Sequence, residues 1–204
     1  HPGDIAALVR LAPPTVGVFT AVGEARYEFF GDLKKLIAEK RRIIESLPQN
    51  GFAILNADDE GVAPMQTHTS AKVLTFGFAP DAAVRGIELQ PSFVLENEAQ
   101  TPCGISFKIA MDGAVAPVLL KDVVGVQHAY AALAAAAAGK AFGLNLIEIA
   151  EGLRSYAPPY GRMHILRGIK KTLIIDDTYN SSPKAALLAL ETVRKISVGE
   201  GGER

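Results

Sequence analysis

The stretch Thr15–Val22, TVGVFTAV, decides the fold class, because it is mostly apolar and rich in β-branched residues. Such a run is typical of a parallel strand that is buried on both faces of a sheet. Outward from it, the sequence predicts a helix, a buried strand, a short helix and a further strand, at Asp32–Leu47, Phe52–Asn56, 58–66 and Val73–Phe76. Strands that alternate with helices in this way favour an α/β fold with a mainly parallel sheet.

The pattern changes in the middle of the chain. Short strands joined by turns are predicted at Val84–Leu89, Phe93–Glu96, Ile105–Met111 and Val115–Leu120. Met111-Asp112-Gly113 is a hairpin signal, so these strands predict an antiparallel extension of the sheet. Two helices follow, at Gln127–Phe142 and Leu146–Tyr156.

A domain boundary is predicted at Pro158-Pro159-Tyr160-Gly161, where a stiff segment meets a flexible residue. A strand, Thr172–Asp176, and a helix from Pro183 to about Ile196 follow it. We therefore expect a central α/β domain at residues 1–160 and the start of a second, Rossmann-like α/β domain at residues 161–204. Because the first residue is His and not Met, we expect a piece of a longer protein.

The composition excludes several classes of protein. Hydrophobic residues make up 49% of the 204 residues and charged residues 21%, enough for a real core. The net charge of −1 offers no basic excess for nucleic acid or an anionic membrane. The single cysteine, Cys103, forms no intrachain disulfide and fits a reducing compartment. No apolar run reaches the roughly 18 residues that span a bilayer, so we expect a cytoplasmic protein without membrane insertion.

Lys40 is the most informative single residue. It lies four residues after Leu36 and four before Ile44, on the apolar stripe of the predicted helix. A lysine that faces inward loses hydration, and its neutral amine can act as a base or become a carbamate, an oxygen ligand suited to Mg²⁺. The alternative is a lysine whose stem packs while its ammonium group reaches water.

Polar residues follow two of the predicted strands. Asp176-Asp177 ends one of them, at the sheet edge where open α/β folds bind ligands, and the next helix N-terminus favours phosphate. Asn56 ends another strand, and Arg162 lies beside the predicted hinge. The alternatives are ordinary capping and turn residues for the first two sites, a solvated arginine for Arg162, and a solvated position for His128 at the start of its helix.

Several short motifs occur in the order in which a known family has them. They are His1-Pro2-Gly3-Asp4-Ile5, VGEARYEFFG at 22–31, LNADD at 55–59, Gly161-Arg162-Met163 and IDDTYNSSP at 175–183. Together they resemble the Mur ligases over nearly the whole chain, and most closely the tripeptide–D-alanyl-D-alanine ligase type. The last motif is the most specific of the set.

The resemblance implies an ATP-dependent peptide ligase of peptidoglycan precursor synthesis, and so of cell-wall biogenesis, cell shape and cell division. Such an enzyme adds D-alanyl-D-alanine to a UDP-N-acetylmuramoyl tripeptide through an acyl phosphate, with ATP and Mg²⁺ as cofactors, and is expected to be a monomer. Residues 1–160 would be the central ATP-binding domain without its phosphate loop, and residues 161–204 the start of the C-terminal domain. The fragment alone is expected to be inactive.

The resemblance also implies roles for individual residues. Lys40 falls where these ligases keep the lysine that can be carbamylated, and would help to hold a metal or the phosphoryl group. Asn56 and His128 would lie near the nucleotide base, and Arg162 would meet phosphate. Two further residues would complete the ATP site, Asp177 near the ribose and Asn180 beside the nucleotide.

Two departures from the family pattern keep other functions open. Arg26 stands where the family has a metal-binding His, and His128 stands at the family's Asn in the segment GVQHAYA, 125–131. The alternatives are a sibling Mur ligase, a folylpolyglutamate synthetase-like ligase, or a degenerate nucleotide-binding or scaffold protein. The third residue of the tripeptide cannot be read from the sequence.

Overall fold

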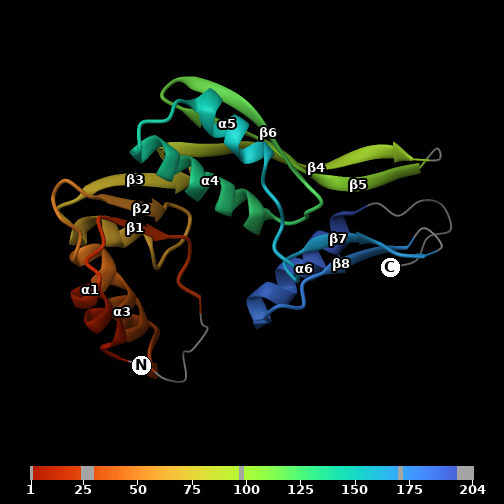
Figure 1. Ribbon diagram of the computed structural model, residues 1–204. Coiled ribbons are helices and arrows are strands. Elements are labelled where there is room, and N and C mark those ends of the chain that lie inside the picture. The colour runs from red at the N-terminus through yellow and green to blue at the C-terminus, as the bar shows by residue number, and fades with distance from the viewer. Residues whose placement is uncertain (1, 24–29, 97–98, 170–171, 197–204) are drawn as a thin grey trace.

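A six-stranded sheet forms the centre of the protein. The computed structural model describes residues 2–23, 30–96, 99–169 and 172–196. The strands lie in the order β1 (Val16–Phe19), β2 (Phe52–Asn56), β3 (Lys72–Gly77), β4 (Val84–Glu96), β5 (Ala99–Met111) and β6 (Ala114–Lys121) (Figure 1). Strands β1 to β4 pair in parallel, whereas β5 pairs antiparallel with both β4 and β6, which confirms the predicted fold class.

Helices cover both faces of the parallel part. On one face, α3 (Leu33–Glu45) and the 3-10 helix η1 (Ala63–His68) pack with Ala53 and Leu55 of β2. On the other face, α4 (Val126–Ala141) packs over Ile54. Successive side chains of a strand point to opposite faces, so β2 needs apolar residues throughout, as the sequence FAILN has. Helix α1 (Asp4–Leu11) packs on α3, and α5 (Leu146–Arg154) packs on β6 and α4.

The alanines of α4 let this helix lie close to the sheet. Ala129, Ala132, Ala136 and Ala137 are all buried. The approach is tight, since a Cβ added at Gly86 of β4 would lie 2.9 Å from Cδ1 of Leu133. In the described part of the chain, no helix combines the length and apolarity that a membrane crossing requires.

The antiparallel extension differs from the prediction in one respect. The two short strands expected at Val84–Leu89 and Phe93–Glu96 form one long strand, β4, because pairing with β5 continues across two register shifts. The predicted hairpin joins β5 to β6, and Asp112 (φ 51°) and Gly113 (φ 78°) supply the two positive φ angles of a tight hairpin turn.

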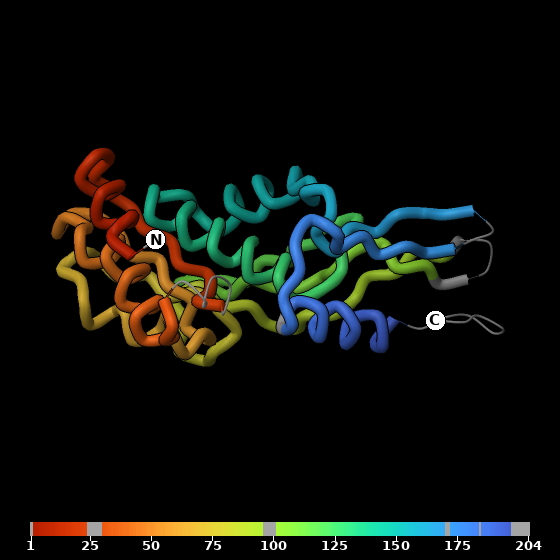
Figure 2. The backbone as a smooth tube through the Cα atoms, turned by 90° about the horizontal axis from the view of Figure 1, so that it is seen from below, coloured from red at the N-terminus to blue at the C-terminus, as the bar shows by residue number. Residues whose placement is uncertain are grey.

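A smaller unit follows the predicted boundary. It contains β7 (His164–Arg167), the antiparallel β8 (Leu173–Asp176) and α6 (Pro183–Lys195). Strand β7 was not predicted. Figures 1 and 2 show the hairpins β4–β5 and β7–β8 extending side by side away from α3. Val124 packs with Met163 and Ile165 in the core of this smaller unit, so the two parts share side chains. The boundary at about residue 161 stays a prediction.

Candidate functional site

Asn56 joins the ends of β1 and β2. Its amide nitrogen donates a hydrogen bond to the carbonyl oxygen of Thr20 (2.7 Å), and its Oδ1 accepts one from the backbone N–H of Asp58 (3.0 Å). The side chain is only 5% exposed. These contacts are those of a turn-forming residue, and the contact with a nucleotide base stays a prediction.

Asp58 ties the loop after β2 to the loop after β3 and to α4. Its carboxylate accepts hydrogen bonds from the backbone N–H groups of Phe78 (2.6 Å) and Ala79 (2.8 Å) and from the hydroxyl of Tyr130 (2.9 Å). Burial, and then the Asp58 carboxylate, raise the pKa of the Tyr130 hydroxyl far above its usual value, so this donor stays protonated. A Cβ at Gly77 (φ 152°) would lie 2.7 Å from Asp58 Oδ2, which explains the glycine.

Lys40 is half-buried on α3, and its ammonium group makes no hydrogen bond or ion pair with another described residue. Among the charged side chains of α3, the buried one is the neighbouring Glu39. It accepts hydrogen bonds from the N–H groups of Gly3 (2.9 Å) and Ile5 (3.3 Å) and pairs with Arg42 Nε (2.9 Å). The intermediate burial of Lys40 fits both alternatives, a reactive amine and a packed stem with a solvated head, so its catalytic role stays a prediction. Arg26 lies outside the described residues.

The segment before β7 is held against the end of β8. The carbonyl oxygen of Gly161 accepts a hydrogen bond from Tyr179 N–H (3.1 Å), and Asp177 Oδ1 accepts one from Met163 N–H (3.2 Å). The guanidinium group of Arg162 lies over the ring of Tyr179, 4.2 Å from its centre. The structure thus places Arg162 and Asp177 in adjacent segments, and their contacts with phosphate and ribose stay predictions.

The turn after β8 is ordered by its own side chains. The Thr178 hydroxyl (2.6 Å) and its N–H (3.2 Å) donate to Asp176 Oδ1, and these hydrogen bonds lower the pKa of this carboxyl group. Asn180 Oδ1 accepts from Ser181 N–H (2.9 Å) and Ser182 caps α6 as predicted. The first turn of α6 carries no acidic residue, so its dipole favours an anion such as phosphate.

One alternative for His128 was a solvated position. It is wrong, because the side chain is only 4% exposed. Its Nδ1 lies 2.7 Å from the Tyr156 hydroxyl and its Nε2 lies 2.8 Å from the carbonyl oxygen of Arg162. Both ring nitrogens are therefore used within the chain, so a hydrogen bond to a base would require one of these contacts to break. The predicted contact of His128 with the base stays a prediction.

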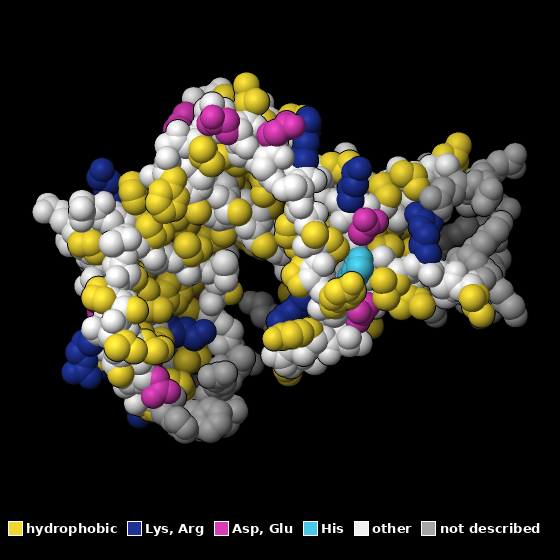
Figure 3. Space-filling view, in the orientation of Figure 1, with side chains coloured by type: hydrophobic (Ala, Val, Ile, Leu, Met, Phe, Trp, Pro, Cys, Tyr) yellow, Lys and Arg dark blue, Asp and Glu magenta, His cyan; other side chains and the backbone are white. Residues whose placement is uncertain are grey.

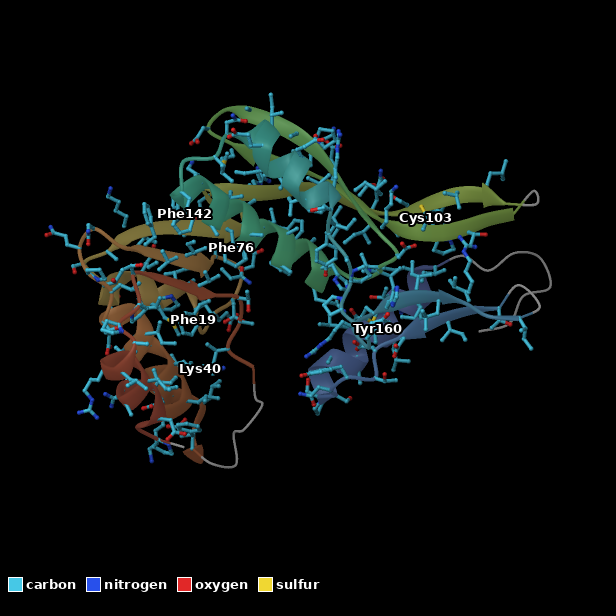
Figure 4. The ribbon with its side chains drawn as sticks, in the orientation of Figure 1. Phe19, Lys40, Phe76, Cys103, Phe142 and Tyr160 are labelled. Carbon is cyan, nitrogen blue, oxygen red and sulfur yellow. The ribbon has the colours of Figure 1, made fainter. Side chains whose placement is uncertain are left out.

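An open hollow separates α3 from the unit of β7, β8 and α6. Figure 3 shows the hollow, with Lys and Arg side chains on both sides of it. Figure 4 places Lys40 on one side and Tyr160, next to Gly161, on the other. Among the residues that the structure describes, no group of three or more His, Cys, Asp or Glu side chains is placed to hold a metal ion.

Comparison with known families identifies the fold. The model of the Mur ligase middle domain matches residues 1–139. The chain belongs to the Mur ligase family. This match covers the sheet and reaches the last turn of α4, so the Mur ligase resemblance of the sequence motifs is confirmed for the central part of the chain.

Mur ligases of the D-alanyl-D-alanine-adding type are similar in sequence to nearly the whole chain. The UDP-N-acetylmuramoyl-tripeptide–D-alanyl-D-alanine ligase of Mycobacterium leprae is 30% identical over 203 residues, which cover 98% of this chain and 39% of that protein. The ligase of the same name from Escherichia coli is 29% identical, over 96% of this chain and 42% of that protein. The chain therefore spans about two fifths of the length of these relatives.

Solved Mur ligase structures have the same fold. A MurF ligase from Thermotoga maritima in complex with ADP superposes with a TM-score of 0.75 at 26% identity, over 97% of this chain and 43% of that one. MurF from Acinetobacter baumannii gives a TM-score of 0.82 at 23% identity, over 97% of this chain and 41% of that one. Both superpositions include the smaller unit after residue 160, since the coverage extends well beyond the central sheet.

Proposed function

We propose that the full-length protein is an ATP-dependent ligase that adds D-alanyl-D-alanine to a UDP-N-acetylmuramoyl tripeptide. The observation that carries this proposal is the similarity to ligases of that name over almost the whole chain, at 30% identity to the relative from Mycobacterium leprae. The ADP complex of the Thermotoga maritima structure supports a nucleotide in the same fold. Because such substrates are UDP-linked precursors made inside the cell, we propose a cytoplasmic location.

The proposed reaction needs positioning and charge stabilisation rather than a protein nucleophile. An oxygen of the peptide carboxylate bonds to the γ-phosphorus of ATP and ADP leaves, which gives an acyl phosphate. The amine of the dipeptide then bonds to the carbonyl carbon, phosphate leaves, and the amine loses a proton. Catalysis of such transfers comes mainly from oriented cations and N–H groups.

The described residues would supply several of these groups. Arg162 would bind phosphate, because its guanidinium is exposed and is already oriented by the Tyr179 ring at 4.2 Å. Asp177 would accept a hydrogen bond from a ribose hydroxyl with the oxygen that Met163 N–H leaves free. Asn180 would lie beside the nucleotide at the start of α6, and Asn56 would lie near the base.

Mg²⁺ is a proposed cofactor, and Lys40 fits one part of its site. Its amine has no partner among the described residues and is half-buried, and as a carbamate it would offer an oxygen ligand. Mg²⁺ takes about six oxygen ligands, so the described residues do not complete a site. In this arrangement the carbamate of Lys40 would place negative charge beside the metal, which in turn would offset the charge of the phosphates.

A phosphate-release assay on the purified full-length protein tests the function. We expect release only when ATP, UDP-N-acetylmuramoyl tripeptide and D-alanyl-D-alanine are all present, together with an amide product of matching amount. Release that instead requires another amine or a folate acceptor would contradict the proposal in favour of a sibling ligase. ATP binding without turnover on any of these substrates would favour a degenerate nucleotide-binding protein.

A further inference from the structure

His128 lies where three parts of the chain meet. It lies in the first turn of α4, contacts Tyr156 just after α5, and reaches the backbone of Arg162 in the segment that leads into β7. The imidazole and the ring of Tyr156 also meet edge to face, with their centres 5.9 Å apart. The side chain is 4% exposed, so its two hydrogen bonds are sheltered from water. Each is therefore stronger than a hydrogen bond at the surface.

The Arg162 carbonyl is the point through which His128 acts on the segment 161–165. On one side of this segment, Val124 N–H donates to Met163 O (3.1 Å) and Ile165 N–H donates to Asp122 O (2.9 Å). On the other side, Met163 N–H donates to Asp177 Oδ1 (3.2 Å). The segment is thus fixed between the start of α4 and the turn after β8.

We propose that His128 is a positioning residue, which holds the Arg162 backbone so that the Arg162 guanidinium and the Asp177 carboxylate bind one nucleotide together. This inference rests on the proposed function, and it gives His128 a role other than contact with the base. A side chain of this length is required, since one ring nitrogen must contact Tyr156 while the other reaches the carbonyl of Arg162. The asparagine of the family motif has no second nitrogen at that distance.

In the neutral imidazole, both ring nitrogens have a hydrogen-bond partner. A carbonyl oxygen only accepts, so Nε2 carries the proton toward Arg162, and Nδ1 accepts from the Tyr156 hydroxyl. A proton on Nδ1 would force the hydroxyl to turn away. Besides these two partners, Asp177 and His164 are the charged or titratable groups that act on His128.

The protonation state follows from this environment. Burial lowers the pKa of His128 below its ordinary value of 6.5, although the hydrogen bond to Arg162 and the charge of Asp177 oppose this effect. The imidazole is therefore neutral at neutral pH, and Nε2 also carries a proton for the Arg162 carbonyl when the ring is protonated.

Two substitutions at this position separate the two hydrogen bonds. In His128→Gln the amide nitrogen reaches the place of Nε2 and keeps the bond to the Arg162 carbonyl. In His128→Asn the shorter amide reaches the place of Nδ1, keeps the contact with Tyr156 and loses the Arg162 carbonyl. We expect the Asn variant of the full-length protein to bind ATP about tenfold more weakly than the Gln variant, which corresponds to about 1.4 kcal/mol.

Hydrogen exchange gives a readout that does not depend on nucleotide. In the absence of ATP, the amides of Met163 and Ile165 should exchange about tenfold faster in His128→Asn than in the wild-type protein, while the Gln variant stays closer to wild type. Asn145→Ala is the matched control, because it removes the capping box at the other end of α5 without touching this segment. It should lower the melting temperature and leave both exchange at these amides and ATP affinity unchanged.

The outcomes separate this inference from the proposed function. Wild-type protein that does not bind ATP would overturn the proposed function, whereas fast exchange in the Asn variant alone would still support the hold of His128 on Arg162. Equal ATP affinity in the Asn and Gln variants, with exchange at Met163 and Ile165 as in wild type, would overturn the positioning role.

Discussion

Replacing Gly161 by alanine should disturb the candidate site more than its small size suggests. Gly161 has φ +66°, in the left-handed region, and a Cβ there would lie 2.7 Å from the backbone nitrogen of Tyr179 and 3.0 Å from its Cβ. Backbone atoms cannot rotate away as a flexible side chain can. The added methyl group must therefore push the turn after β8 away from the segment before β7.

The expected cost has two parts. A left-handed conformation costs an L-residue about 1–2 kcal/mol, and overpacking a close contact adds about 1–3 kcal/mol. Gly161→Ala should therefore lower the free energy of unfolding by about 2–5 kcal/mol. Gly143 is the matched control, because it has φ +84° and nothing within 4 Å of an added Cβ. Gly143→Ala should lose only the conformational part, about 1–2 kcal/mol.

Urea unfolding of both variants of the full-length protein, with an ATP titration of each, measures this difference. We expect Gly161→Ala to be the less stable variant and also to bind ATP more weakly, because the hydrogen bond between Tyr179 N–H and Gly161 O (3.1 Å) and the stacking of Arg162 on Tyr179 depend on the same approach. Equal stability losses in the two variants would refute the reasoning. So would wild-type ATP affinity in Gly161→Ala.

Four further predictions concern charged or titratable groups. Lys40→Ala should abolish amide formation by the full-length protein without changing its melting temperature, whereas Lys34→Ala, at an exposed position of the same helix, should keep activity; turnover in the first variant would rule out its role. Asp177→Ala should weaken ATP binding by about five- to thirteenfold, since one ribose hydrogen bond is worth about 1–1.5 kcal/mol, and Asp177→Asn should weaken it less; unchanged affinity in a titration would exclude the ribose contact. Glu39→Ala should lower the free energy of unfolding by about 1–2 kcal/mol, because the Glu39 carboxylate accepts hydrogen bonds from the N–H groups of Gly3 and Ile5 and so caps the start of α1. An unchanged urea midpoint would show that this cap does not contribute to stability. Since the pKa of His128 is lowered in the folded protein, its contribution to stability is complete above pH 6.5 and is lost as the pH falls through the lowered pKa. The free energy of unfolding of the wild-type protein should therefore fall with pH in this acidic range more steeply than that of His128→Asn. The same pH dependence in both proteins, measured by urea unfolding, would contradict the assignment.

The parallel strands could be predicted because their signal is local. A run such as FAILN must be apolar on both faces whatever packs on it, so β2 was predicted with its observed ends. The hairpin turn at Asp112 and Gly113 was equally local. Strand β7 was missed because four residues form a strand there only through pairing with β8 and a bridge to Val123.

The candidate site was predicted in part for the same reason. Helical spacing placed Lys40 near the buried stripe, but it could not show that Glu39 would turn inward, since the N–H groups that Glu39 binds lie 36 and 34 residues away. The partners of His128 lie 28 and 34 residues away, so its burial was equally out of reach. The roles of Arg162 and Asp177 in nucleotide binding came from motif order alone, and they stay predictions.

The path of a labelled oxygen tests the proposed ligase chemistry most directly. The full-length protein would be given ATP, D-alanyl-D-alanine and a UDP-N-acetylmuramoyl tripeptide whose terminal carboxylate carries heavy oxygen. If the carboxylate attacks the γ-phosphorus, that oxygen stays on phosphorus when the amine displaces phosphate, so each phosphate released should carry one labelled oxygen. Amide formation with unlabelled phosphate, or the absence of any amide, would contradict it.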